Sequence, residues 1–248
     1  MTRVVGVIPA RWGSTRFPGK SLAPIMGTPL IEWVLARARQ ARRLDDVLVA
    51  TDDERIYKHV SRLGASVVMT GSHHQSGTDR IAEAVHGIPA DVIINVQGDE
   101  PLIDPRLIDQ LAEAMLADPS LEMATAARPI MNPEELSLPS VVKVVWDGRR
   151  RALYFSRAVI PYVRNADAAG KDPLHWCHIG IYAYRRDFLE KFVHTPPTVL
   201  ERVESLEQLR ALHMGAKIMV IPADQAGAGV DTPEDVARVE DVLRRMGS

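Results

Sequence analysis

Short apolar runs rich in Val and Ile alternate with amphipathic segments over roughly the first half of the chain. The apolar runs are too continuous for strands with one solvated face, and this is typical of strands buried on both faces of a parallel sheet. The pattern predicts strands at Val4–Ile8, Asp46–Ala50, Ser66–Met69, Asp91–Val96 and Met123–Ala126.

The segments between these runs have helical periodicity. In the first, apolar residues recur on one helix face, with Thr28 as the expected N-cap and Pro29 in the first helical position. Further helices are predicted at Asp53–Leu63, ending at Gly64, near Thr78 and after Asp104-Pro105. Alternating strands and helices imply right-handed crossovers and a mostly parallel sheet, which binds ligands at the carboxyl ends of its strands.

The pattern changes in the middle of the chain. Val141–Trp146 and Arg151–Phe155 flank Asp147-Gly148, a strong hairpin signal, and a third strand is predicted at Cys177–Ala183. The chain then returns to helices at Arg185–Val193, Thr198–Met214 and Thr232–Met246, with a strand at Lys217–Ile221. We therefore predict an α/β fold in one domain, residues 1–248, with a smaller antiparallel insertion at about 138–184.

Composition and charge exclude several classes of protein. The chain has 248 residues, of which 46% are hydrophobic and 25% charged, the balance of an ordinary globular protein. A net charge of −2 gives no basic field to recruit nucleic acid, and no apolar stretch approaches the roughly 20 residues that span a bilayer. The first residues lack the apolar core of a signal peptide, and the single Cys177 allows no internal disulfide. We expect a cytoplasmic protein that binds neither nucleic acid nor membrane.

The loop after the first strand, Pro9–Ser21, is a candidate phosphate-binding loop. It fails as a Walker A motif, because five residues separate Gly13 from Gly19 and Pro24 follows where a helix should begin. Its glycines, its hydroxyls on Ser14 and Thr15 and its cations still suit a phosphate. The cations are Arg11, Arg16 and Lys20. The alternative is a solvated basic turn.

Two further segments carry candidate metal ligands. Asp99 lies in Asn95–Pro101, directly after the fourth predicted strand, where a carboxylate can hold Mg²⁺ against a ligand's phosphates. Asp231 precedes the helix start at Thr232-Pro233, where Thr232 and Asp235 form a predicted capping arrangement that does not need Asp231. The alternatives are a turn acid for Asp99 and a solvated loop acid for Asp231.

Two other features are interpreted as structural. His73-His74 lacks an acid or a second His at ligand spacing, so we expect a surface loop. Cys177 lies in an apolar strand without basic neighbours in sequence and is expected to be a buried thiol.

Taken together, these segments resemble the sugar-acid cytidylyltransferases. The signature loop of that family is similar to Ile8–Arg11 and Ser14–Lys20. Further matches, which favour the branch that activates 3-deoxy-D-manno-octulosonate (Kdo), are His74–Arg80, Asn95–Pro101, Val141–Val144 with Tyr154–Arg157, His178–Tyr182, Leu206–Arg210 and Gly229–Pro233. They cover essentially the whole chain. Phe17 stands where Leu is common, and Ala228 stands where a hydroxyl residue is expected.

The resemblance implies a Rossmann-like nucleotidyltransferase fold, a Mg²⁺ cofactor and a homodimer, with the insertion serving sugar binding and dimerisation. The implied reaction joins CTP and Kdo to give CMP-Kdo and pyrophosphate for lipopolysaccharide biosynthesis. Arg11, Lys20, Asp99 and Asp231 would be catalytic, and the two aspartates would hold Mg²⁺. The implied nucleotide-binding residues are Arg11, Ser14, Thr15, Lys20, Gln75, Ser76, Gly77, Arg80, Gln97 and Asp99. The implied sugar-binding residues are Gln97, Arg157, His178, Tyr182, Glu204 and Gln208.

Alternatives stay open at this point. CMP-sialate synthetases share the first loop, a glycosyltransferase could have a similar fold, and Kdo is not separated from 8-amino-Kdo. Glu204 and Gln208 are four apart and would share one face of the predicted helix, or form a solvated face. Glu201 is expected to be the N3 residue of a capping box with Thr198 rather than a sugar contact.

Overall fold

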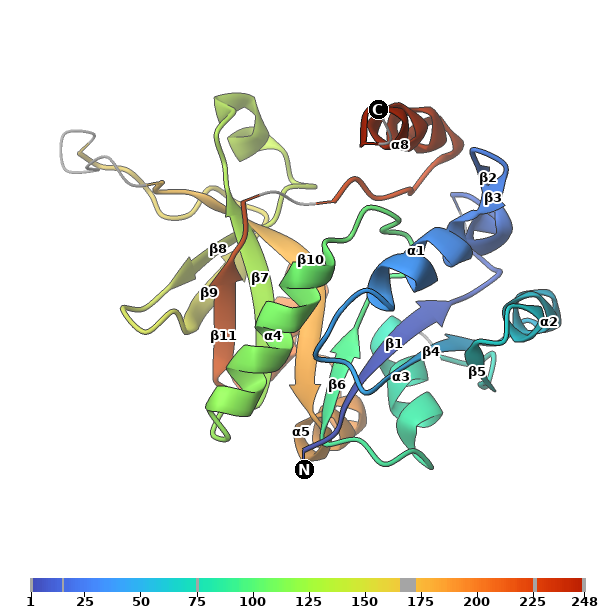
Figure 1. Ribbon diagram of the computed structural model, residues 1–248. Coiled ribbons are helices and arrows are strands. Elements are labelled where there is room, and N and C mark those ends of the chain that lie inside the picture. The colour runs from blue at the N-terminus through green and yellow to red at the C-terminus, as the bar shows by residue number, and fades with distance from the viewer. Residues whose placement is uncertain (1, 15, 75, 166–172, 225–226, 247–248) are drawn as a thin grey trace. The chain divides into compact units, whose positions relative to one another are not determined.

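The computed structural model describes residues 2–14, 16–74, 76–165, 173–224 and 227–246 (Figure 1). The chain forms two compact units. The N-terminal unit comprises Met1–Glu113 and Gly227–Ser248, and the central unit comprises Ala114–Ala226. The predicted single domain with an insertion stays a prediction; the residues of that insertion lie in the central unit.

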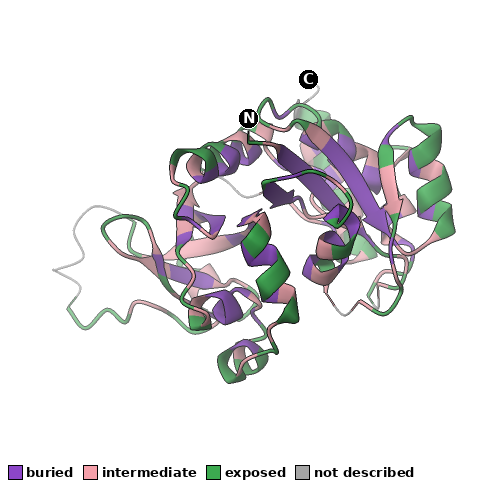
Figure 2. Cartoon of the chain, turned by 90° about the horizontal axis from the view of Figure 1, so that it is seen from below, coloured by how far each residue is buried: buried purple, intermediate pink, exposed green. Residues whose placement is uncertain are grey.

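A parallel sheet forms the centre of the N-terminal unit. Its strands, in spatial order, are β5 (Ser66–Met69), β4 (Asp46–Thr51), β1 (Val4–Ala10) and β6 (Val92–Asn95). Three of them, β1, β4 and β6, are buried along almost their whole length (Figure 2). This burial is why their sequences read as continuous Val and Ile runs, and it confirms the predicted parallel arrangement.

Helices with one apolar face accompany this sheet. They are α1 (Leu30–Ala38), α2 (Glu54–Arg62), α3 (Gly77–Val85), the first part of α4 (Pro105–Ala117) and α8 (Pro233–Met246). Asp53 caps α2 by accepting a hydrogen bond from Arg55 N, and Ser76 caps α3 in the same way through Asp79 N. No helix in the described part of the chain is both long and apolar enough to cross a membrane.

The predicted cap of α1 is wrong. Thr28 belongs to a short antiparallel pair, β2 (Pro24–Ile25) with β3 (Thr28–Pro29), in which it pairs with Ile25. The pair is turned by Met26 and Gly27, both at positive φ. Because Thr28 is committed to this ladder, Pro29 occupies the N-cap position without any side-chain cap bond. A short 3₁₀ helix, η1 (Lys20–Leu22), precedes the pair.

The central unit contains a mixed sheet. Strand β7 (Met123–Pro129) pairs in parallel with β11 (Ile218–Pro222) and antiparallel with β10 (Trp176–Arg185). Strands β8 (Lys143–Trp146) and β9 (Ala152–Ser156) form the predicted hairpin beside β10. Its turn is closed by a hydrogen bond of 2.9 Å from Asp147 N to Arg151 O. The fold class is confirmed as α/β, with a parallel sheet and a smaller antiparallel part.

The helix predicted over Thr198–Met214 is wrong as one element, because Ser205 breaks it with a left-handed backbone (φ 52°). The central unit has instead α6 (Val199–Glu204) and α7 (Gln208–His213), besides η2 (Pro133–Ser137) and α5 (Arg186–His194). Glu204 ends one helix and Gln208 begins the next, so they do not share one helix face as predicted.

Glu201 forms the predicted capping box with Thr198 and, in addition, a buried ion pair. Its carboxylate lies 3.0 Å from Arg210 Nη2, and both side chains are less than a tenth exposed. Removing one partner of a buried pair leaves the other charge without compensation. This pair therefore ties α6 to α7 across the break at Ser205.

We expect Glu201→Gln to destabilise the chain by about 3 kcal/mol, because glutamine preserves the capping box but leaves the Arg210 charge unpaired. Urea unfolding measures the change. Exposed Glu190 on α5 supplies the control, since its pairing with Arg186 lies at the surface and Glu190→Gln should change stability by less than about 0.5 kcal/mol. Equal effects of the two substitutions would contradict a buried, structural Glu201.

Candidate active site

The loop after β1 is closed by one carbonyl. Trp12 O accepts hydrogen bonds from Ser14 N at 2.9 Å and from Gly19 N at 3.0 Å. Gly19 has φ 73° and passes the chain into η1, whose first residue is Lys20. A Cβ at position 19 would lie 2.9 Å from the Trp12 ring, so glycine is required there by conformation and by contact. Arg11 is exposed, and Thr15 lies outside the described residues.

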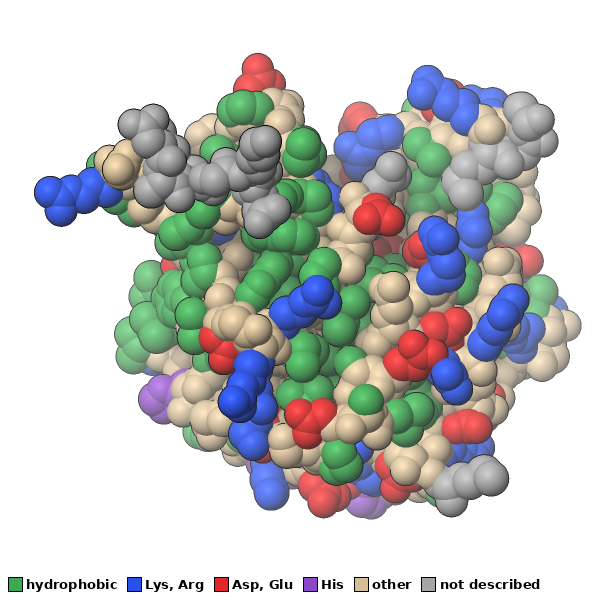
Figure 3. Space-filling model, turned by 60° about the vertical axis from the view of Figure 1, so that its left-hand side comes forward, with side chains coloured by type: hydrophobic (Ala, Val, Ile, Leu, Met, Phe, Trp, Pro, Cys, Tyr) green, Lys and Arg blue, Asp and Glu red, His purple; other side chains and the backbone are tan. Residues whose placement is uncertain are grey.

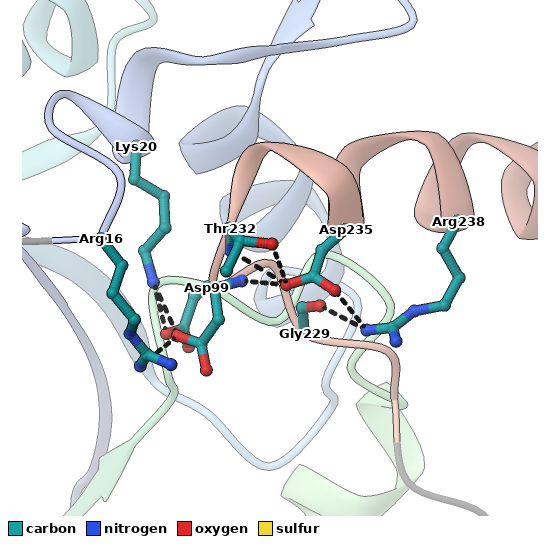
Figure 4. Close-up of polar contacts among 8 residues, drawn as sticks. Arg16, Lys20, Asp99, Gly229, Thr232, Asp235 and Arg238 are labelled. Carbon is teal, nitrogen blue, oxygen red and sulfur yellow. Dashed lines mark hydrogen bonds and ion pairs between the residues drawn. The ribbon is translucent and has the colours of Figure 1, made fainter.

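Lys20 joins the two predicted metal ligands. Its Nζ lies 2.8 Å from Asp99 Oδ2 and 3.5 Å from Asp231 Oδ1. Arg16 Nη2 lies 3.1 Å from the same oxygen of Asp231. Figure 4 shows the Lys20 and Arg16 side chains extending toward the region of the Asp99 carboxylate. Three distant segments of the chain therefore converge on one cluster of two cations and two anions.

Backbone contacts hold these segments together. Val230 N donates to Asp99 O at 2.8 Å, which fastens the segment before α8 to the segment after β6. A Cβ on Gly98 would lie 2.5 Å from Pro9 O, so only glycine lets the Asp99 segment lie against the end of β1. Asp235 Oδ2 accepts from Asp231 N and Thr232 N, both at 2.9 Å, which confirms the predicted cap of α8 (Figure 4).

The donor set fits a divalent cation that is shared with a ligand. Asp99 and Asp231 approach a single ammonium group, and carboxylate oxygens are the ligands that Mg²⁺ prefers. Among the described residues, no group of three or more His, Cys, Asp or Glu side chains could hold a metal ion. Mg²⁺ typically uses one or two carboxylates together with water and substrate phosphates, so two carboxylates are an adequate set.

Glu100, the acid that follows Asp99, was not predicted from the sequence to have a role. Its Oε2 is buried and has no hydrogen-bond partner among the described residues. Desolvation, with a smaller contribution from the charge of Asp99, raises the pKa of Glu100 to about 7. Only the order Asp-Glu before Pro101 was visible in the sequence, and burial of the second acid could not be inferred from it.

The residues expected to line the nucleoside have structural partners. Arg80 is almost fully buried and donates to Asp52 Oδ2 at 2.7 Å and to Thr70 Oγ1 at 2.6 Å. Gln97 Nε2 donates to Asn95 Oδ1 at 3.3 Å. Ser76 and the exposed Gly77 form the N-terminus of α3, and Gln75 lies outside the described residues. Contacts of these residues with a nucleotide stay predictions.

The neighbouring His73-His74 segment forms the expected loop, with one contact that its spacing does not reveal. His74 Nε2 bonds to Glu83 on α3. Glu83 Oε2 also accepts from Gly71 N at 3.0 Å. The sequence shows no acid at ligand spacing from these histidines, but in the fold Glu83 lies beside His74 and fastens the loop to α3.

In the central unit, three predicted sugar-binding residues form one polar cluster. His178 Nε2 lies 2.9 Å from Thr125 Oγ1, and Tyr182 OH donates to Gln208 Oε1 at 3.3 Å. A register shift in β10 between Ile179 and Tyr182 allows the His178 and Tyr182 rings to approach to 5.4 Å between centroids. Gln208 is 2% exposed, and its amide nitrogen has no hydrogen-bond partner among the described residues.

Desolvation sets the charge state of this cluster. It lowers the pKa of His178 to about 3 and raises the pKa of Tyr182 well above its ordinary value. Both side chains are therefore neutral at physiological pH. The cluster offers hydrogen bonds and no charge, which suits the hydroxyl groups of a sugar better than its carboxylate.

Hydrogen bonds in both directions connect Glu204, at the end of α6, with Ser156 and Arg157, at the end of β9. Ser156 Oγ donates to Glu204 Oε1 at 2.6 Å and Arg157 N donates to Glu204 Oε2 at 2.9 Å. The Arg157 guanidinium donates to Glu204 O at 2.6 Å, Pro139 O at 2.7 Å and Ser205 O at 3.2 Å. Arg157 thus satisfies carbonyls at the end of α6, and its expected pairing with a sugar carboxylate stays a prediction.

Lys143 is a buried cation that the sequence analysis did not single out. Its Nζ donates to Arg157 O at 2.6 Å, Val141 O at 2.7 Å and Leu138 O at 3.2 Å, and its side chain is fully buried. Desolvation lowers the pKa of Lys143. Cys177, expected to be buried, is only half-buried, and desolvation raises the pKa of its thiol.

The fold is similar to that of solved cytidylyltransferases, which are nucleotidyltransferases. The cytidylyltransferase family model matches residues 5–218. A solved structure of CMP:2-keto-3-deoxy-manno-octonic acid synthetase complexed with CTP superposes with a TM-score of 0.94 at 44% identity, covering 99% of this chain and 100% of the other. A 4-diphosphocytidyl-2C-methyl-D-erythritol synthase from Anaerococcus prevotii, 14% identical with a TM-score of 0.65, covers 98% of this chain and 99% of the other and shares the fold.

Curated relatives are similar over their whole length. The 3-deoxy-manno-octulosonate cytidylyltransferase of Bdellovibrio bacteriovorus is 50% identical over 246 residues, covering 99% of both chains. That of Syntrophotalea carbinolica is 49% identical over 248 residues, covering 98% of this chain and 99% of its own. The chain therefore belongs to the cytidylyltransferase family, in its 3-deoxy-manno-octulosonate branch, as the motifs predict.

The pKa of His178 gives a test of this cluster. The unfolded chain binds a proton at His178 near pH 6.5, whereas the folded chain does not until about pH 3, so this residue makes stability fall as the pH drops through that window. Between pH 7 and pH 5 the loss is up to about 2 kcal/mol. His178→Gln keeps a donor for Thr125 and should remove this part of the loss. Urea unfolding at both pH values measures it, and an equal loss in both proteins would contradict a neutral His178.

Proposed function

We propose that this chain activates Kdo with CTP, giving CMP-Kdo and pyrophosphate for lipopolysaccharide biosynthesis. The observation that carries the proposal is the convergence of Lys20, Asp99 and Asp231 beside the carboxyl ends of β1 and β6. Parallel sheets bind their ligands at this edge. Membership of the 3-deoxy-manno-octulosonate cytidylyltransferases supplies the substrates.

The β1 loop binds the triphosphate of CTP. Lys20 and Arg11 neutralise its charge, and the backbone of the glycine-containing loop approaches the phosphates closely. The anomeric hydroxyl of Kdo attacks the α-phosphorus in line, and pyrophosphate leaves from the opposite side. Charge grows on the leaving oxygens during this step, so Lys20 stabilises the transition state more than bound CTP.

Asp99 and Asp231 hold a Mg²⁺ cofactor. When bound, this ion supplies charge neutralisation at the phosphates and lowers the pKa of an oxygen that it contacts. In the chain alone Lys20 compensates both carboxylates. When the nucleotide binds, Lys20 turns to its phosphates, and the carboxylates are left for the cation.

The central unit binds the sugar. The unpartnered Gln208 amide donates to a hydroxyl group of Kdo, and neutral His178 and Tyr182, whose single N–H and O–H are used within the cluster, accept from others. An unsatisfied buried donor is costly unless a ligand provides its acceptor. Glu204, held by Ser156 and Arg157, accepts from a further sugar hydroxyl. The other sugar-binding residues that the family resemblance implies are Arg157 and, in the N-terminal unit, Gln97.

The nucleoside end of CTP lies along the start of α3. Ser76 and Gly77 present backbone groups there, with Gln75 beside them in sequence. Buried Arg80 positions this helix start through Asp52 and Thr70, and its own contact with the nucleotide follows from the resemblance.

The chain functions as a homodimer in the cytoplasm, where CTP is available. The central unit exposes large apolar side chains, among them Tyr162 at 86%, Met131 at 78% and Val203 at 78%. Figure 3 shows hydrophobic side chains gathered over the left half of the face in view. Exposed apolar side chains that gather on one face are typical of a protein–protein interface. Sedimentation equilibrium tests the dimer, and a monomer at micromolar concentration would contradict it.

One assay tests the substrate pair. Pyrophosphate release is measured with CTP and Mg²⁺ in the presence of Kdo, 8-amino-Kdo or sialic acid. We expect release to depend on Kdo and to yield CMP-Kdo in equal amount. Release that is no faster with Kdo than without sugar, or a preference for one of the other two acids, would contradict the proposed substrate.

Removing one carboxylate tests the cation site. Asp99→Asn should raise the activation barrier by on the order of several kcal/mol and weaken Mg²⁺ binding in the presence of CTP. Asp231→Asn should raise the Mg²⁺ requirement. Asp241→Asn, which changes an exposed acid on α8, is the control and should alter neither quantity. Unchanged Mg²⁺ affinity in Asp99→Asn would remove Asp99 from the site, whatever its activity.

A further inference from the structure

The Trp12 indole lies between two other groups in the N-terminal unit. On one side, the guanidinium carbon of Arg55 is 3.3 Å from the centre of the Trp12 ring, a cation–π contact at stacking distance. Elsewhere the indole edge packs against Gly19, so closely that a Cβ there would lie 2.9 Å from two ring carbons. Trp12 O also accepts from the amides of Ser14 and Gly19. Trp12 therefore contacts the β1 loop with both its backbone and its side chain.

Arg55 is itself held in place. Its Nε donates to Asp53 Oδ1 at 2.9 Å and its Nη2 to Asp53 Oδ2 at 2.7 Å, a bidentate pair. Asp53 is the N-cap of α2, where its Oδ1 accepts from Arg55 N at 2.9 Å. The guanidinium is thus fixed to the start of a helix, and that helix follows β4, the neighbour of β1 in the sheet. The loop and α2 are coupled through this stack.

We infer that Asp53, Arg55 and Trp12 form a clamp that positions the β1 loop, making Trp12 and Arg55 positioning residues for the triphosphate. The clamp acts through Gly19 on the residue that follows it, Lys20, which the proposed function places at the phosphates. Gly13 and Gly19 leave this loop free to adopt many backbone conformations. A ring held on one side by Arg55 and packed against Gly19 removes that freedom before CTP arrives, which reduces the ordering cost of binding.

Arg55→Ala tests the inference, with Arg106→Ala as a matched control. Arg106 forms a similar set of bonds to Asp104 at the start of α4, with Nε on both carboxylate oxygens, Nη2 on Oδ2 and Arg106 N on Oδ1. The control therefore removes an equivalent pair from a helix start outside the β1 loop. Two properties are measured for each variant: amide hydrogen exchange at Ser14 and Gly19 without ligand, and kcat and KM for CTP in pyrophosphate release.

Arg55→Ala should speed exchange at both amides and raise KM for CTP by roughly fivefold, while kcat changes less. Trp12→Leu should speed exchange and raise KM as Arg55→Ala does, whereas Trp12→Phe, which keeps an aromatic ring, should retain most of the wild-type exchange rate and KM. The double variant Arg55→Ala/Trp12→Leu should differ little from either single variant. Arg106→Ala should change neither property. Unchanged exchange in Arg55→Ala, or additive effects of the two substitutions, would overturn the clamp.

The inference rests on the proposed function only for its kinetic half. Amide exchange reports the loop without any substrate. If the wild-type chain releases no pyrophosphate with CTP and Kdo, the proposed function fails, and faster exchange in Arg55→Ala would still support the clamp. If the wild-type chain is active and Arg55→Ala has wild-type exchange and KM, the clamp fails alone.

Discussion

Two carboxylates from segments far apart in the chain, Asp99 and Asp231, are held near one another by the ammonium group of Lys20, 2.8 Å from one and 3.5 Å from the other. Two carboxylates that approach one ammonium group would repel each other without that cation. The Lys20 side chain is 15% exposed, while those of Asp99 and Asp231 are 33% and 52% exposed, so water screens part of the interaction. The loop after β1, the segment after β6 and the start of α8 all converge on this cluster. Their local backbone features, including Gly19, Gly98 and the cap by Asp235, place the three charged groups in contact.

The same arrangement prepares the N-terminal unit for an anionic ligand and its cation. Lys20 and Arg16 already occupy positions next to the carboxylates, and a triphosphate with Mg²⁺ supplies charges of both signs that can exchange partners with them. In the proposed complex the ionic groups would therefore stay paired with and without the ligand, and no half-buried charge would be left uncompensated. The central unit presents a different chemistry, in which desolvation keeps His178 and Tyr182 neutral and Gln208 has a donor to spare.

Much of the fold could be predicted from the sequence wherever burial alone determines the local hydrophobic pattern. Continuous Val and Ile runs identify β1, β4 and β6, because burial on both faces requires them, and Asp99 is found by its place after such a strand. Predictions failed where a backbone pairing or a tertiary contact, rather than the local hydrophobic pattern, decides where an element begins or ends. Thr28 is drawn into a ladder with Ile25, and the helix over Thr198–Met214 is broken at Ser205, whose carbonyl Arg157 binds.

The partners of buried charged side chains could not be predicted from the sequence either. Arg80 with Asp52, Glu201 with Arg210 and Lys143 with three carbonyls are set by tertiary packing, and sequence spacing carries no record of them. The stack of the exposed Arg55 on Trp12 is likewise set by tertiary packing, since it joins the start of α2 to the β1 loop. Side chains that a family resemblance assigns to ligands, such as Arg80 and Arg157, prove to have structural partners as well.

The sharing of Lys20 between Asp99 and Asp231 is tested most directly by titrating Mg²⁺ into the chain without nucleotide, comparing wild type with Lys20→Met by calorimetry. If Lys20 is the cation that compensates both carboxylates, removing it leaves them to attract another, so Lys20→Met should bind Mg²⁺ more tightly than wild type. Equal or weaker binding by Lys20→Met would contradict the account, because it would mean that Lys20 does not compensate the charge of these two carboxylates.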